Sequence, residues 1–179
     1  DKDTTGVMVV SRTLEAHTAL VDALQLRDIK REYVAITQGV VTAGRTIDEP
    51  IGRHPVDRKR MSVQENGKDA VTHFTVREKF KSHSLIDVRL ETGRTHQIRV
   101  HMAHLRYPLL GDQVYGGRLA IPKGISAQLE QLIRNFKRQA LHAFRLSFAH
   151  PITAEPLSFE AQLPEDMTQL IDALRKDDS

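Results

Sequence analysis

The sequence has no cysteine and no tryptophan among its 179 residues. The lack of cysteine excludes disulfide bonds and thiolate chemistry from this chain, and it agrees with a reducing compartment such as the cytoplasm. Aromatic residues make up only 5% of the chain, with three tyrosines and six phenylalanines. Few side chains are therefore available to stack on a planar ligand.

Long apolar runs are also missing. No stretch approaches the roughly 20 apolar residues that a membrane-spanning helix needs, so we expect no membrane partner. No secretory signal pattern is present. The hydrophobic content of 40% is ordinary for a globular protein, and the length of 179 residues suits one domain with a core of its own.

The chain has little net charge, but its basic residues are clustered. The net charge is only +3, from 26 basic and 23 acidic residues. Basic residues form three runs, which are Arg53, His54, Arg58, Lys59 and Arg60; then Arg94, His96, Arg99 and His101; then Arg134, Lys137 and Arg138. A single run is usually a solvated face, but three runs in one domain favour a polyanionic partner.

The hydrophobic pattern predicts a mixed α/β (α+β) fold. Period-two alternation or short apolar runs indicate strands over 6–10, 31–41, 61–64, 70–80, 84–90, 139–148 and 157–161. Helical spacing indicates helices over 13–26, from Thr95 to before Pro108, over 126–136 and over 164–174. Successive strands joined by short links pair antiparallel. We therefore predict a mainly antiparallel sheet with flanking helices.

Two local predictions concern turns. Asn66 and Gly67 are a strong hairpin signal, so we expect strands 61–64 and 70–80 to pair through this turn. The segment 42–60 contains Pro50, Gly52 and Pro55, which predict a loop. This loop would carry the first basic run.

One stretch, from Leu90 to His101, combines a strand end, a tight turn and a helix start. Thr95 is the expected N-cap of the helix. The turn brings several basic side chains near one strand end, and guanidinium groups and helix N-termini both attract anions. A basic surface helix is the alternative interpretation of this pattern.

The residues from Thr92 to His101 resemble the third motif of the RluA-type pseudouridine synthases, which modify RNA. Other family motifs follow in the family's order. Asp1 to Gly6 is similar to the end of the catalytic motif, and the segment 31–35 resembles the one that supplies the active-site tyrosine. Smaller landmarks are the segments 107–112 and 141–143, and the segments 53–55 and 122–124 resemble the RluD branch, which acts on large-subunit ribosomal RNA.

The resemblance implies the pseudouridine synthase fold and a cofactor-free isomerisation of specific uridines, in which an essential aspartate acts on a flipped-out base. It implies catalytic roles for Asp1, Tyr33 and Arg99. Asp1 would be the essential carboxylate, Arg99 its partner, and Tyr33 the ring beneath the uracil. Asp3 competes with Asp1 for the first role, but the spacing to the following Thr-Thr-Gly favours Asp1.

The substrate pocket and its surroundings are expected to include further residues of the same motifs. Leu90 and Ile98 would be apolar walls, and Arg94 and His96 would also bind substrate. The basic run at Arg53, His54, Arg58 and Arg60 would contact RNA phosphates, which position the RNA without reading its sequence. The implied partner is large-subunit ribosomal RNA, bound by a cytoplasmic monomer without metal or organic cofactor.

Because the family's catalytic motif begins before its aspartate, residues 1–179 are interpreted as part of one catalytic domain. The upstream part of that domain, and any S4-like RNA-binding domain, would lie outside this sequence. A non-catalytic RNA-binding or ribosome-assembly module remains an alternative function. A metal-dependent hydrolase using His96, His101 and His104 is a weaker one, because these spacings lack the i, i+4 pair of a helical zinc site.

Overall fold

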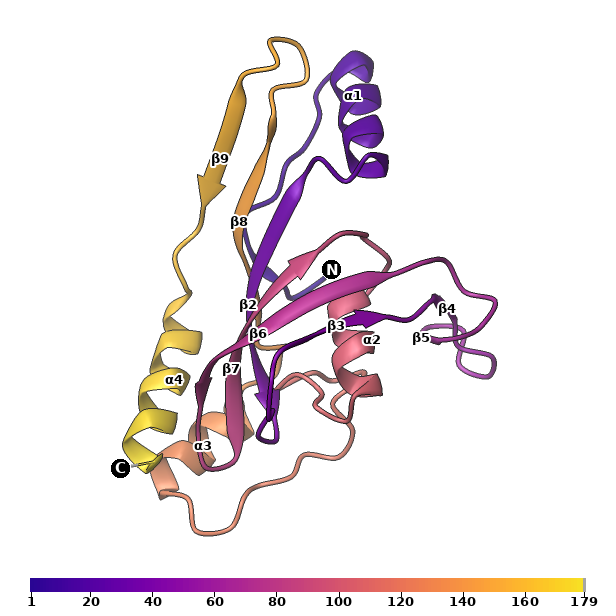
Figure 1. The fold of residues 1–179 in the computed structure, drawn as a ribbon. Coiled ribbons are helices and arrows are strands. Elements are labelled where there is room, and N and C mark those ends of the chain that lie inside the picture. Colours follow the sequence, from indigo (N-terminus) through magenta and orange to yellow (C-terminus); the bar gives the residue numbers. More distant parts are fainter. Residues whose placement is uncertain (179) are drawn as a thin grey trace.

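The computed structural model describes residues 1–178 and contains a seven-stranded sheet and a two-stranded sheet (Figure 1). The larger sheet has the strand order β1-β8-β2-β7-β6-β3, and β9 pairs with β8. Its strands are β1 (Thr5–Gly6), β2 (Lys30–Gln38), β3 (Arg45–Asp48), β6 (Val71–Lys79), β7 (His83–Leu90), β8 (Leu141–Ala149) and β9 (Pro156–Glu160). All its pairings are antiparallel except that of β1 with β8. The predicted mixed, mainly antiparallel sheet is therefore confirmed.

Helices cover the two faces of this sheet differently. The helices α3 (Ala127–Asn135) and α4 (Glu165–Asp178) pack on one face, where Val34 and Ile36 of β2 join their core. The helix α2 (Gln97–His104) packs on the other face, over Ala35 and Ile86 (Figure 1). The alternation of β2 thus buries both of its faces, as expected for a central strand.

Two predicted helix starts are confirmed, because the expected residue caps the helix in each case. The Thr13 hydroxyl accepts a hydrogen bond from the Ala16 N–H at 3.2 Å, at the start of α1 (Leu14–Gln25). The Ser126 hydroxyl accepts one from the Leu129 N–H at 3.3 Å, at the start of α3. Each side chain satisfies an N–H that has no partner within its helix. Every helix within residues 1–178 is too short or too polar to span a bilayer.

The predicted strand over 6–10 is wrong beyond Gly6, where β1 ends. The strand β1 pairs only with His142 and Ala143 of β8, and the Val7 N–H donates the last bond to the Ala143 carbonyl at 3.0 Å. From Arg145 onward β9 occupies the same edge of β8, so the chain cannot continue along it. Met8 is consequently 80% exposed.

The predicted hairpin at Asn66 and Gly67 is also wrong, although the chain does turn there. The strand β5 (Met61–Val63) pairs with β4 (Ile51–Arg53) in the small sheet, and β6 pairs with β3 and β7. Gly67 instead lies against Ile51, where a Cβ would come within 2.6 Å of the Ile51 backbone. Glycine is needed for that close approach. The segment 42–60 accordingly contains β3 and β4 and is not a continuous loop.

Candidate active site

The buried side chain of Gln97 holds the turn between β7 and α2. Its carbonyl oxygen accepts from the Thr92 hydroxyl at 2.8 Å and from the Arg94 N–H at 2.9 Å. Its amide group donates to the Val71 carbonyl and the Thr72 hydroxyl of β6 at 3.0 and 2.9 Å. Gln97 therefore makes two hydrogen bonds within the turn and two to the sheet, which together fix the positions of the side chains that follow.

The helix α2 begins one residue later than the sequence indicates. Its N-cap is His96 and not Thr95, and no side chain caps the helix. His96 adopts a left-handed backbone with φ of 59°, a conformation that is unfavourable for most side chains. Strain of this kind persists where the surrounding contacts impose it, and the hydrogen bonds of the adjacent Gln97 supply that constraint.

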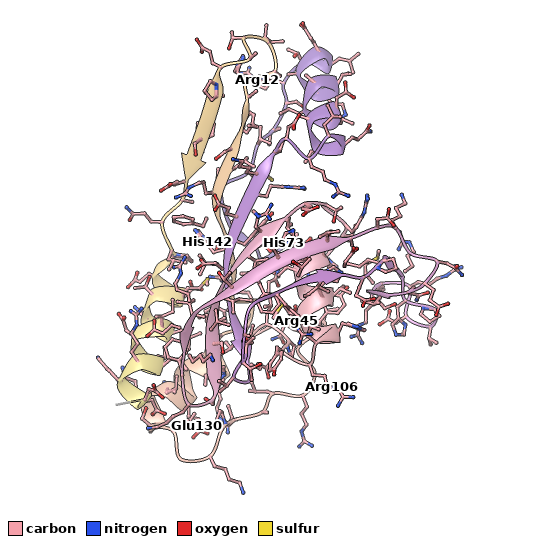
Figure 2. The ribbon with its side chains drawn as sticks, in the orientation of Figure 1. Arg12, Arg45, His73, Arg106, Glu130 and His142 are labelled. Carbon is pink, nitrogen blue, oxygen red and sulfur yellow. The ribbon has the colours of Figure 1, made fainter. Side chains whose placement is uncertain are left out.

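Asp1 is placed by contacts of the segment that follows it. The Gln139 amide donates to the Lys2 carbonyl at 2.7 Å and to the Thr4 hydroxyl at 3.0 Å. The Thr5 hydroxyl bonds to the ring of His142 at 2.9 Å, and that histidine lies in the middle of the molecule (Figure 2). These contacts hold β1 and the residues before it against β8.

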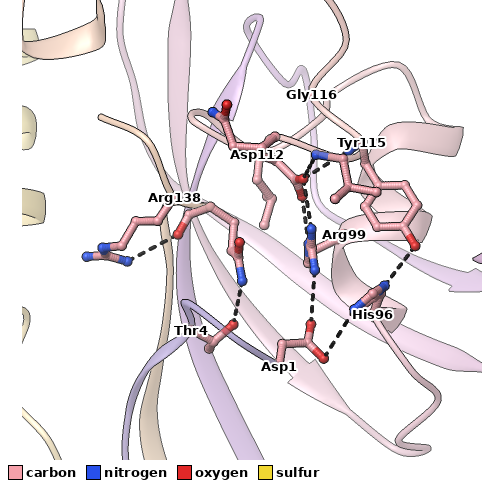
Figure 3. A network of polar contacts seen from close by, with 12 residues as sticks. Asp1, Thr4, His96, Arg99, Asp112, Tyr115, Gly116 and Arg138 are labelled. Carbon is pink, nitrogen blue, oxygen red and sulfur yellow. Dashed lines mark hydrogen bonds and ion pairs between the residues drawn. The ribbon is translucent and has the colours of Figure 1, made fainter. Parts of the chain in front are cut away.

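The Asp1 carboxylate lies between two basic groups (Figure 3). One oxygen is 3.7 Å from the Arg99 guanidinium, and the other is 4.0 Å from Nε2 of His96. The Asp1 side chain is 23% exposed, whereas that of Arg99 is 5% exposed. The expected partnership of Asp1 and Arg99 is thus present in the geometry, with His96 as a second neighbour.

Arg99 makes its shortest contacts with Asp112. Its Nε and one terminal nitrogen donate to the two carboxylate oxygens at 2.7 and 2.9 Å. Burial alone would raise the pKa of Asp112, but the hydrogen bonds from Arg99 and from the Tyr115 and Val114 N–H groups together lower that pKa below its ordinary value. Asp112 therefore stays ionised and holds the guanidinium in one orientation.

His96 is paired on its other nitrogen with Tyr115. The Tyr115 hydroxyl lies 2.8 Å from Nδ1 of His96, and the rings meet edge to face at 5.5 Å. Burial, with a smaller effect of the nearby Arg99, lowers the pKa of His96. The imidazole is therefore neutral at pH 7 and carries one proton.

A cavity of about 240 Å³ opens beside the Asp1 carboxylate. Its walls come from separate elements, with Tyr33 on β2, Leu90 on β7, Ile98 on α2 and Leu141 on β8. Arg31, Arg94 and His96 add basic groups to the lining. Burial raises the pKa of Tyr33, so its hydroxyl keeps its proton at neutral pH. Every residue predicted for the substrate pocket thus lines one space.

Asp3 does not share this position. Its backbone is left-handed, with φ of 67°, and it lies in a different hollow with Phe136 and Asp166. The two neighbouring aspartates are therefore separated by the turn between them, and only Asp1 lines the basic cavity.

The three histidines of the hydrolase alternative do not converge. The ring of His101 is buried and bonds to the Thr72 hydroxyl and the Glu49 carbonyl, both at 2.9 Å. His96 faces Asp1, and His104 is exposed. Within residues 1–178 no group of three histidine, aspartate or glutamate side chains is arranged to hold a metal ion.

A protein-family model matches the part of the chain that carries the predicted site residues. The family model described as RNA pseudouridylate synthase covers residues 1–104, which include Asp1, Tyr33 and Arg99. The chain belongs to the RNA pseudouridylate synthase family. The resemblance of its motifs to that family is thereby confirmed.

Relatives of known sequence and structure agree with this assignment. The chain is 59% identical over 177 residues to a ribosomal large subunit pseudouridine synthase D of Vibrio cholerae, and 55% identical to that of Xanthomonas campestris pv. campestris. Each match covers 99% of this chain and 55% or 54% of the relative, so the chain spans about half the length of these relatives. The solved structure of human RNA pseudouridylate synthase domain containing 4 superposes with a TM-score of 0.76 at 26% identity, covering 98% of this chain and 73% of that chain.

In this pseudouridylate synthase family member the first basic run, from Arg53 to Arg60, lies outside the cavity, on the β4–β5 hairpin (Figure 1). Arg53, Arg58 and Lys59 are exposed. The His54 side chain stabilises the loop between β4 and β5, because its Nδ1 accepts a hydrogen bond from the Asp57 N–H at 3.0 Å. Arg60 instead covers the Tyr115 ring at 5.3 Å. The run thus divides into solvent-facing cations and one cation that touches the site.

The sequence interpretation gave no functional role to Asp112, Tyr115 or Gln97. Asp112 belonged to a family landmark with Gly111, which was the available signal for it. Tyr115 lies three residues further along the same loop, and its N–H donates to the Asp112 carboxylate at 2.9 Å. Its contact with His96, 19 residues away, depends on how this loop packs beside α2 and left no local pattern.

Proposed function

We propose that the protein converts specific uridines of large-subunit ribosomal RNA into pseudouridine. In this reaction the bond from ribose C1′ to uracil N1 breaks, C1′ is rejoined to C5, and the C5 proton is lost while N1 gains one. The observation that carries the proposal is the Asp1 carboxylate, placed between Arg99 and His96 at the edge of a cavity with a tyrosine in its wall. The names of the bacterial relatives support the choice of RNA.

Asp1 is the proposed catalytic carboxylate. An ionised carboxylate can attack C1′ or remove the 2′ proton, and both routes need a group that is charged and oriented. The Arg99 guanidinium, 3.7 Å from the carboxylate, is the counter-ion that favours the ionised form of Asp1. Asp112 fixes the orientation of Arg99. The neutral His96 adds a polar neighbour without a second positive charge.

Tyr33 is the proposed platform for the uracil. A uridine must leave its stack before a side chain can reach C1′, and a flipped base gains stacking energy on an aromatic ring. Leu90 and Ile98 would enclose the base, while Arg94 would meet the adjacent phosphate. The exposed cations of the β4–β5 hairpin would bind the RNA backbone further away.

The remaining parts of the proposal concern the whole protein. We infer that residues 1–179 are part of the catalytic domain of a longer, monomeric cytoplasmic protein that works without metal or organic cofactor. The greater length of the relatives supports the first part, and the reaction itself requires no redox change or phosphoryl transfer.

The test uses ribosomal RNA with tritium at uracil C5, which is released to water when the C1′–C5 bond forms. The full-length protein is compared with its Asp1→Asn and Asp3→Asn variants. We expect release by the wild type and by Asp3→Asn, and none by Asp1→Asn. Binding of the RNA without release by the wild type would overturn the proposal and favour a ribosome-assembly module. Loss of release in both variants would remove the assignment of Asp1.

A further inference from the structure

Tyr115 makes four contacts that join the site to the basic hairpin. Its hydroxyl accepts from the Met61 N–H of β5 at 2.9 Å and meets Nδ1 of His96 at 2.8 Å. Its ring lies under two guanidinium groups, that of Arg99 at 4.9 Å and that of Arg60 at 5.3 Å. The Tyr115 residue is itself buried, with 7% of its surface exposed.

The hydrogen bonds of Tyr115 determine where the His96 proton lies. The Met61 N–H can only donate, so the phenol oxygen accepts that bond. The phenol proton then has Nδ1 of His96 as its partner, and Nδ1 must be the unprotonated nitrogen. The opposite tautomer would leave the phenol proton buried without an acceptor, which costs free energy. The single proton of the neutral imidazole therefore lies on Nε2.

This tautomer directs an N–H at the proposed catalytic carboxylate, because Nε2 lies 4.0 Å from Asp1. The same phenol group is bonded to the backbone of β5, whose hairpin carries Arg53, Arg58 and Lys59. Displacement of the hairpin by RNA would thus move the group that orients His96.

We propose that Tyr115 is a positioning residue, which fixes His96 in the Nε2–H tautomer facing Asp1 and couples it to the β4–β5 hairpin. The part of this inference that concerns turnover rests on the proposed function. The part that concerns the tautomer is independent of any activity.

The tautomer is measured by nitrogen NMR on the full-length protein with labelled histidine, with His96 assigned from its loss in His96→Gln. We expect the proton on Nε2 in the wild type. Asp1 also favours that tautomer, so the decisive comparison removes Asp1 first. In Asp1→Asn the proton should stay on Nε2, and in Asp1→Asn with Tyr115→Phe the two tautomers should mix. A proton on Nδ1 in the wild type, or a mixture already in Asp1→Asn, would overturn the proposal.

The coupling is measured with Tyr115→Phe alone, which keeps the ring and removes the hydroxyl. The Met61 N–H loses its acceptor and should exchange with solvent faster, while turnover on saturating RNA falls about tenfold and RNA affinity stays within about twofold. Tyr107→Phe is the matched control, because Tyr107 packs against the core around Met102. Equal exchange and equal turnover in the two variants would reject the coupling. If the wild type releases no tritium, the tautomer experiment still decides the structural part.

Discussion

Arg99 and Asp112 form a two-point ion pair in the interior, with side chains that are 5% and 0% exposed. This pair differs from the contact of Arg99 with Asp1, which is longer, at 3.7 Å, and reaches a partly exposed carboxylate. Arg99 therefore has a structural partner and a proposed catalytic partner. The two roles can be separated by substitution.

Arg99→Met should abolish turnover and leave most RNA affinity intact, because Asp1 loses its guanidinium while the exposed cations of the β4–β5 hairpin remain. It should also lower the free energy of unfolding by about 3 to 5 kcal/mol, since the buried Asp112 carboxylate is left unpaired. Urea denaturation and tritium release measure the two effects.

The double variant Arg99→Met with Asp112→Asn separates them. Neutralising residue 112 should restore part of the lost stability, whereas turnover should stay absent because Asp1 still lacks its partner. Recovery of turnover along with stability would mean that Arg99 acts only through folding.

Tyr33→Phe tests whether the hydroxyl of the proposed platform takes part in proton transfer. The phenylalanine keeps the ring, so RNA affinity should remain within about twofold. We expect turnover to fall on the order of 10²-fold, which is typical for the loss of a proton-transferring group. Single-turnover tritium release on saturating RNA is the measurement. Near-normal release by Tyr33→Phe, with loss in Tyr33→Ala, would limit Tyr33 to stacking.

Arg58→Gln tests the hairpin as a phosphate-binding surface. Removing one exposed cation should weaken RNA binding and lower the slope of log affinity against log salt by about 0.7 to 0.9. Arg12→Gln is a charge-matched control, because Arg12 is exposed at the α1 end of the molecule, away from the hairpin (Figure 2). Equal slopes for the two variants would indicate that the hairpin cations are only a solvated face.

The sequence predicted what local patterns and motifs encode. The Thr13 and Ser126 caps follow from hydroxyl side chains before periodic segments, and the wall of the cavity follows from motif residues such as Tyr33 and Ile98. The pairing of β5 with β4, and not with β6, depends on contacts with Ile51 that are distant in sequence. The role of Tyr115 depends in the same way on Met61 and His96, 54 and 19 residues away. Contacts between residues so far apart in the chain produce no periodicity or motif spacing in the sequence, so the sequence alone could not predict them.

The stability of the fold should depend on pH through His83. This residue is 2% exposed at the start of β7, and burial lowers its pKa from the ordinary 6.5 to about 4. Between these pKa values the unfolded chain binds a proton that the folded protein excludes, so the free energy of unfolding falls as the pH drops from 6.5 to 4. The contribution of His83 to this fall is about 3 kcal/mol.

Urea denaturation at pH 7 and pH 4.5 measures this contribution through the difference between the wild type and His83→Gln. The variant should lose the His83 contribution and keep the smaller contributions of His96 and His101, whose pKa values burial also lowers. His104→Gln, at an exposed position on the same helix as His101, should keep the wild-type pH dependence. If His83→Gln showed the same pH dependence as His104→Gln, the buried neutral state of His83 would not be a source of acid sensitivity.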